Sequence, residues 1–163
     1  MIIRVAKNAE KLNLGRVVVG TDSIEILNVC RSNKVEVLMT QKTHKSGTDR
    51  VYEVYNSLNE NFDLVINLQG DLPFFTKQLF ESLIELFVDD KVDIGSAICN
   101  LDNNELDDPN IVKAKVNLDE RNQGFALDFT RVAKVKDNLY HHIGIYIYKP
   151  DVLKKFINLK QSK

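Results

Sequence analysis

Val65-Ile66-Asn67-Leu68-Gln69-Gly70-Asp71-Leu72-Pro73 is the stretch that decides the fold. Its apolar first half predicts a short buried strand, and Pro73 prevents that strand from continuing. Gln69, Gly70 and Asp71 then place polar groups at the carboxyl end of the strand, where open α/β sheets bind ligands. Gly70 permits a sharp turn or a close approach to a ligand, and Asp71 offers a carboxylate to a divalent cation. An ordinary Gly-Asp turn is the competing interpretation of the same pattern.

The rest of the chain alternates between strand and helix patterns around this stretch. Apolar residues at helical spacing follow capping residues, and short β-branched runs precede polar loops. Strands are predicted at 16–20, 35–39, 64–68, 93–99, 112–118, 125–129 and 142–148, and helices at 2–14, 24–29, 47–58, 76–87 and 151–157. Gly15 is the expected stop of the first helix. This βαβα order predicts a doubly wound α/β fold with a mixed, mainly parallel sheet.

Length and composition limit the possible classes of protein. A chain of 163 residues predicts a single domain over residues 1–163. Its 22 Lys+Arg against 23 Asp+Glu, without a basic block, argue against a nucleic-acid partner. Without an apolar run near the ~20 residues of a membrane span, we expect no membrane insertion and a cytoplasmic location. Cys30 and Cys99 lie far apart in apolar surroundings and are predicted to be buried, reduced thiols.

The beginning of the chain is unusual for a nucleotide-binding α/β domain. Such domains normally open with a strand and a Gly-rich or basic loop, whose backbone N–H groups neutralise phosphates. Here the first seven residues already have a helical pattern, and neither GxGxxG nor GxxxxGK[ST] occurs in the sequence.

Five polar motifs recur at predicted strand ends, in the order and near the spacing found in one enzyme family. They are Ser46-Gly-Thr-Asp-Arg50, Gln69-Gly-Asp-Leu-Pro73, Asn110-Ile-Val-Lys113, Ala126-Leu-Asp-Phe-Thr-Arg131 and His142-Ile-Gly-Ile-Tyr146. With these motifs the chain resembles the 3-deoxy-manno-octulosonate cytidylyltransferases, also called CMP-Kdo synthetases, over nearly its whole length. The resemblance implies a fold of the nucleotide-diphospho-sugar transferase type.

The resemblance also implies a reaction and a set of site residues. In this family the anomeric hydroxyl of the sugar acid Kdo attacks the α-phosphate of CTP with the help of Mg²⁺, giving CMP-Kdo and pyrophosphate for lipopolysaccharide assembly. Asp71 would be the catalytic metal ligand. The other implied roles are the sugar pocket for Gln69, Arg131, His142 and Tyr146, and the cytosine and ribose for Ser46, Gly47 and Arg50.

These residue types suit the reaction, although each has a simpler interpretation. In-line displacement at phosphorus needs a metal and cations more than a protein nucleophile, and the planar fork of Arg matches a carboxylate. Arg50 alone would be a solvated helix residue and Arg131 a surface charge. His142 would be a half-exposed strand residue and Tyr146 a packing residue. Only the joint occurrence of the motifs favours the functional interpretation.

The chain differs from the family at both ends. The family's opening strand and phosphate loop precede the position of Met1, and its final third, with the second metal carboxylate, has no counterpart here. We therefore expect the sheet to lack its first strand, so that the strands at 16–20 and 35–39 are separated from those after Leu64. We also expect residues 1–163 alone to be prone to aggregation and inactive, because a missing central strand leaves backbone groups unpaired.

Other interpretations remain open at this point. A sister cytidylyltransferase for 8-amino-Kdo or sialic acid is one, and a non-catalytic remnant of the enzyme is another. CTP and Kdo are the expected small-molecule partners, and a homodimer is a further possibility that the resemblance allows.

Overall fold

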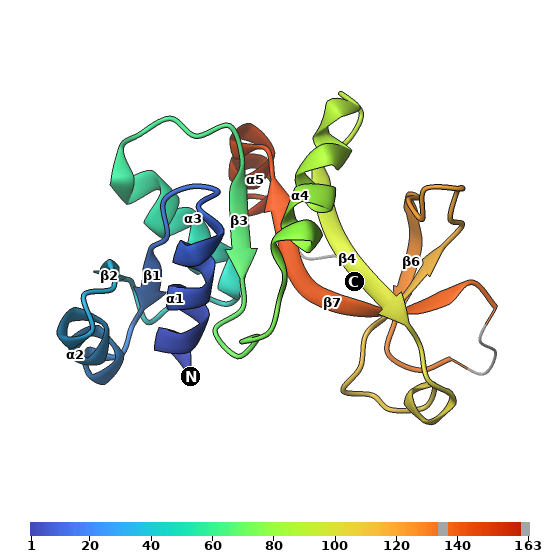
Figure 1. Cartoon of the computed structure of the whole chain (residues 1–163), viewed down its shortest axis with the longest axis horizontal. Helices are drawn as coiled ribbons and strands as arrows, with labels where there is room; N and C mark the ends of the chain where they lie inside the picture. The colour runs from blue at the N-terminus through green and yellow to red at the C-terminus, as the bar shows by residue number, and fades with distance from the viewer. Residues whose placement is uncertain (134–136, 161–163) are drawn as a thin grey trace. The chain divides into compact units, whose positions relative to one another are not determined.

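The computed structural model describes residues 1–133 and 137–160 and divides the chain into two compact units (Figure 1). The first unit combines Met1–Gly95 with Ile145–Lys163, and the second is Ser96–Gly144. Strands β4 (Ile94–Asn100) and β7 (Leu139–Tyr148) each pass from one unit into the other. That the whole chain is one domain stays a prediction.

The first unit contains all the α-helices of the described chain and three complete strands. In chain order they are α1 (Ile2–Leu12), β1 (Val19–Thr21), α2 (Ile24–Ser32), β2 (Val37–Met39), α3 (Gly47–Leu58), β3 (Val65–Leu68), α4 (Lys77–Glu85), followed by a 3-10 turn (Leu86–Val88), and α5 (Pro150–Phe156). Helices α2, α3 and α4 begin where predicted, because Ser23, Ser46 and Thr76 cap them with their side-chain oxygens.

Strand pairing in the first unit separates β1 and β2 from β3. Strands β1 and β2 pair in parallel, with Val19 opposite Val37, and form a sheet of their own. Strand β3 pairs antiparallel with the end of β7, with Leu68 opposite Ile145. Helix α3 contacts both β1 and β3. The predicted separation of the early strands from those after Leu64 is confirmed by these two sheets.

One hydrophobic cluster fixes the β1–β2 sheet against the first two helices. Its buried members are Ala6 of α1, Val19 of β1, Cys30 of α2 and Val35. The partly buried side chains packed against this cluster are Ile2, Ile3, Val17 and Val37. Burial of each valine in the cluster contributes roughly 1.5–3 kcal/mol.

The second unit is built from antiparallel strands. It contains most of β4, a 3-10 turn (Asn103–Glu105), β5 (Lys113–Val116), β6 (Ala126–Thr130) and the first half of β7. Strand β5 pairs with β6 and β7, and both pairings are antiparallel. The mixed α/β class is confirmed. Strands β1 and β2 pair in parallel, whereas the β3–β7, β5–β6 and β5–β7 pairs are antiparallel. The reason is connection length, since β5, β6 and β7 follow one another without the crossover helix that parallel strands need.

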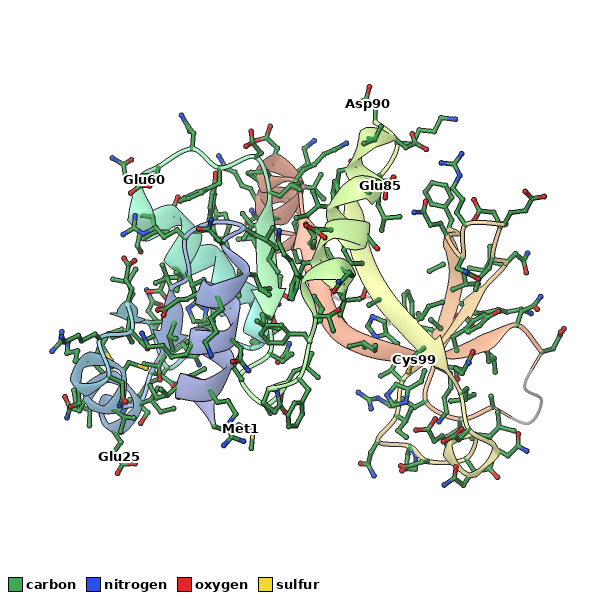
Figure 2. All side chains as sticks on the ribbon, viewed as in Figure 1. Met1, Glu25, Glu60, Glu85, Asp90 and Cys99 are labelled. Carbon is green, nitrogen blue, oxygen red and sulfur yellow. The ribbon has the colours of Figure 1, made fainter. Side chains whose placement is uncertain are left out.

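Two local predictions were wrong. Helix α1 ends at Asn13, which adopts a left-handed conformation with φ 54°, rather than at Gly15, because Asn also tolerates that region. Cys99, which is labelled near the end of β4 in Figure 2, is exposed, whereas Cys30 is buried as predicted.

No helix in the described part of the chain combines the length and apolar character needed to cross a membrane.

Candidate active site

The turn after β3 is the centre of the candidate site in the first unit. Leu72 donates its backbone N–H to the carbonyl oxygen of Gln69 at 3.2 Å, which closes the turn, and Asp71 is exposed at its tip. Gly70 does not have a positive φ, so the turn does not need the conformational freedom of glycine. A Cβ at Gly70 would lie only 3.1 Å from Cδ1 of Ile2. A side chain at position 70 would therefore require the tip of Ile2 to move by a few tenths of an ångström, because α1 packs closely against the turn.

The start of α3 lies next to this turn. Ser46 and Asp49 form a capping box, in which the Ser46 hydroxyl accepts from the Asp49 N–H at 3.2 Å and the Asp49 carboxylate accepts from the Ser46 N–H at 3.0 Å. A Cβ at Gly47 would lie 3.8 Å from Nε2 of Gln69. The structure therefore brings Ser46, Gly47 and Gln69 together, and their roles toward the substrates stay predictions.

Arg50, one turn into α3, is committed to contacts within the protein. Its guanidinium donates to Oγ1 of Thr40 at 2.6 Å and to Oδ2 of Asp22 at 2.9 Å. The hydrogen bond from Arg50 is the main cause that lowers the pKa of Asp22. Arg50 thus links the residues that follow β1 and β2, and it is not the solvated helix residue of the simpler interpretation. The sequence analysis did not identify Asp22 as a site residue, although Asp22 follows β1 and Asp71 lies in the turn that follows β3.

Tyr146 lies on β7 opposite Asn67 of β3. Its ring stacks on that of Tyr148 with centroids 6.2 Å apart and an interplanar angle of 28°. Burial raises the pKa of both phenols, and Tyr148 also has a side-chain hydrogen bond with Thr48 of α3. Asn67 is buried and donates to Oγ1 of Thr48 at 3.5 Å. A polar residue inside an apolar strand was the signal that could have identified Asn67.

His142 forms the centre of a second cluster, in the second unit. It is buried, its Nε2 lies 2.7 Å from Oγ of Ser96, and the ring of Phe129 meets it edge-on at 5.2 Å. Burial, with a smaller contribution from the charge of His141, lowers the pKa of His142, which favours the neutral imidazole. Ser96 was missed, because a single serine in a strand has no local pattern.

Lys113 and Arg131 support the loops near this cluster. The Lys113 side chain is fully buried, and its Nζ donates to the carbonyl oxygens of Asp108 and Arg131, each at 2.6 Å. Arg131 in turn donates from Nη1 to the carbonyl oxygen of Pro109 at 3.0 Å. Lys113 therefore has a structural role that its motif, Asn-Ile-Val-Lys, did not reveal.

The predicted site residues fall into two sets. Ser46, Gly47, Arg50, Gln69, Asp71 and Tyr146 belong to the first unit, and Arg131 and His142 belong to the second.

A surface hollow in the first unit is lined by other residues. It has a volume of about 820 Å³ and includes Tyr55, Phe62 and Leu64, which precede β3, with Phe87 and Lys149. None of the predicted site residues lines it. We assign the site by its polar groups, since the hollow lies at the start of β3 and ligands of open α/β sheets bind at the carboxyl ends of strands.

A metal site made only of protein ligands is absent from residues 1–133 and 137–160, where no three His, Cys, Asp or Glu side chains gather. Mg²⁺ is commonly held by one or two carboxylates together with substrate phosphates. Asp71, exposed at the tip of its turn, fits such a site as a single protein carboxylate.

Comparison with known proteins gives the family. The family model described as Cytidylyltransferase matches residues 1–163. The chain belongs to the cytidylyltransferase family. Its members are nucleotidyltransferases, and the predicted class of enzyme is confirmed.

Individual relatives agree with this assignment. The 3-deoxy-manno-octulosonate cytidylyltransferase of Bartonella henselae is 38% identical over 167 residues, covering 99% of this chain and 69% of that protein. The enzyme of the same name from Bradyrhizobium diazoefficiens is also 38% identical, covering 99% of this chain and 68% of that protein. A solved structure of CMP:2-keto-3-deoxy-manno-octonic acid synthetase complexed with CTP matches 99% of this chain and 68% of its own, with 29% identity and a TM-score of 0.83. The predicted nucleotide-diphospho-sugar transferase type of fold is confirmed by this match.

Proposed function

We propose that this cytidylyltransferase uses CTP and Kdo and forms CMP-Kdo and pyrophosphate, which activates Kdo for lipopolysaccharide assembly. The observation that carries the proposal is the identity of 38% over 99% of the chain with relatives named for this sugar acid. The arrangement of Ser46, Gly47 and Gln69 beside the Asp71 turn supports it, because these are motif residues that a fold without a site has no reason to gather.

Asp71 is the residue that we propose for the metal. When bound, Mg²⁺ supplies positive charge against the phosphate oxygens at which negative charge develops. Asp71 is exposed at the tip of its turn, where its carboxylate is available to a cation and a phosphate together.

The remaining residues would hold and orient the substrates. We assign the start of α3, with Ser46 and Gly47, and Arg50 to the nucleoside, and Gln69 and Tyr146 to the sugar. Arg50 would act from a fixed position, because Asp22 and Thr40 hold its guanidinium.

In the second unit, Arg131 would bind the carboxylate of Kdo through its planar fork. His142 would meet sugar hydroxyls as a neutral imidazole, since its burial disfavours the charged form. The cytoplasm, where CTP is made available, is the compartment that we propose for this reaction.

A transfer assay tests the function directly. The 163-residue chain and a chimera, in which this chain replaces the matched stretch of the Bartonella henselae relative, are incubated with CTP, Kdo and Mg²⁺. We expect CMP-Kdo and pyrophosphate in equal amounts from the chimera, and none when Mg²⁺ is removed with a chelator. A chimera that unfolds cooperatively and binds CTP but leaves Kdo unreacted would contradict the proposed acceptor, and sialic acid or 8-amino-Kdo would then be assayed in its place.

A further inference from the structure

The segment 41–45 connects β2 to α3 and has a residue of the candidate site network next to each of its ends. Thr40, just before the segment, accepts from the guanidinium of Arg50 at 2.6 Å. Ser46, just after it, caps α3 beside Gly47. The conformation of this short segment therefore affects the position of both parts of the proposed nucleoside site.

Glu53 of α3 holds the segment at two points. Its Oε2 atom accepts from the backbone N–H of Gln41 at 3.0 Å, and the same oxygen contacts Nε2 of His44. The side chain of His44 is 16% exposed and that of Glu53 27%, so water competes only in part for these contacts. The hydrogen bond from His44 is the main cause that lowers the pKa of Glu53, which favours the charged carboxylate.

Glu53 and Arg50 are carried by the same helix. They are three residues apart on α3, so their side chains project from one face of it. The charge of Arg50 also lowers the pKa of Glu53, by less than the hydrogen bond from His44 does. One rigid element thus presents the arginine proposed for the nucleoside and the carboxylate that holds the adjacent segment.

A surface ion pair is the simpler interpretation of the contact between His44 and Glu53, and such pairs contribute little to stability. The bond from Gln41 argues against it, because a main-chain donor fixes the backbone of the segment itself. A segment that is fixed before a ligand arrives loses less conformational entropy when the ligand binds. The arrangement therefore suits pre-organisation of a site.

We propose that Glu53 is a positioning residue of the nucleotide site, which acts through Gln41 and His44 to fix the segment 41–45. The inference rests on the proposed function, since it concerns the residues assigned there to the nucleoside. It implies that loss of the Glu53 carboxylate weakens the use of CTP and leaves the use of the acceptor sugar unchanged.

Hydrogen exchange of the full 163-residue chain tests the contact without any substrate. In Glu53→Ala we expect the amides of 41–45 to exchange about tenfold faster or more, because Gln41 loses its acceptor and the segment can open locally. Glu85→Ala is the matched control, since it removes an exposed carboxylate from the end of α4, and it should leave these amides unchanged. Unaltered exchange of the segment in Glu53→Ala would overturn the proposal.

Steady-state kinetics of the chimera tests the consequence for the nucleotide. We expect Glu53→Ala to raise KM for CTP about tenfold and to change KM for Kdo by less than about twofold. His44→Ala should shift KM for CTP in the same direction, and His44→Gln should restore most of the loss, because its amide N–H can donate to Glu53.

The outcomes of the kinetics separate this role from a general loss of structure. If KM for CTP and KM for Kdo rise together, or if KM for CTP stays at the wild-type value in Glu53→Ala, the positioning role is overturned and the proposed function stands. A wild-type chimera that does not use CTP would overturn the proposed function and this role with it.

Discussion

The turn after β3 and the loops around Lys113 each contain a charged side chain, but one is exposed and the other is buried. Asp71 is exposed at the tip of its turn. Lys113 is fully buried, and two backbone carbonyl oxygens accept from its ammonium group. A buried ammonium group that donates to two carbonyl oxygens holds the loops around it together, whereas an exposed carboxylate is available to a substrate or a metal. The difference distinguishes residues that act on ligands from residues that maintain the structure.

Substitution of Asp71 should give the largest effect on activity. Asp71→Asn keeps the shape of the side chain but removes the charge that attracts Mg²⁺, so we expect kcat for CMP-Kdo formation to fall at least about 100-fold in the active chimera. The thermal unfolding temperature should not change, because Asp71 is exposed. Asp63→Asn is the matched control, since Asp63 is also exposed and precedes β3. Near-normal turnover by Asp71→Asn would remove the metal role from this residue.

Lys113 should show the opposite behaviour, with stability as the main readout. Lys113→Met keeps an unbranched side chain but leaves the carbonyl oxygens of Asp108 and Arg131 without their donor. Each buried group without a partner costs roughly 1–3 kcal/mol, so the free energy of unfolding in urea should fall by about 2–5 kcal/mol. Lys115→Met, on the same strand but exposed, should change it by less than about 0.5 kcal/mol. Similar losses in the two variants would show that burial of the Lys113 charge does not matter.

Arg131 lies between these two extremes, since it is exposed yet partly held by the protein. Arg131→Lys keeps the charge and loses the bidentate fork, so we expect KM for Kdo to rise about tenfold or more while KM for CTP changes little. Steady-state kinetics of the chimera with each substrate varied in turn makes the measurement. Arg121→Lys, in a loop of the same unit, serves as the control. If both KM values of Arg131→Lys move together, Arg131 does not contact the sugar.

Local structure that depends on residues close together in the sequence was predicted correctly. Ser46 and Asp49 are three positions apart, and their capping box places the start of α3 correctly. Pairing between distant residues was not predictable in the same way. Arg50 and Asp22 are 28 positions apart, and nothing in either segment indicates the other. The family motifs supplied long-range information of a different kind, because they brought Gln69 and Gly47 into one site without predicting any of the contacts between strands.

The same contrast applies to residues that support the candidate site. Ser96 contacts His142 across strands, and a lone serine has no spacing that marks it. Cys99 was predicted to be buried because its neighbours are apolar, but strand alternation and the end of β4 leave it exposed. Local hydrophobicity alone does not determine burial when a strand has one open face.

Substitution of His142 should give the smallest of these effects. The experiment tests whether this buried imidazole lowers the free energy of unfolding in acid. Burial lowers the pKa of His142, so the unfolded chain takes up this proton more readily than the folded chain. Above the ordinary histidine pKa of about 6.5 the group is neutral in both states and has no effect. As the pH falls below about 6.5, the unfolded state binds more protons and the free energy of unfolding decreases, until the lower pKa of the folded state is passed.

Carboxylates lose their stabilising effect in a separate and lower window. The pKa values of Glu105 and Asp119 are lowered mainly by backbone hydrogen bonds, so their contributions decline only as the pH falls through and below the ordinary carboxylate range near about 4. Urea unfolding of the wild type and of His142→Gln, compared at about pH 7.5 and about pH 5.0, therefore isolates the histidine. We expect the wild type to lose more stability than His142→Gln between these two conditions, by less than the effect of Lys113→Met. Parallel losses in the two proteins would mean that His142 is protonated as easily in the folded chain as in the unfolded one, and its burial would then carry no electrostatic cost.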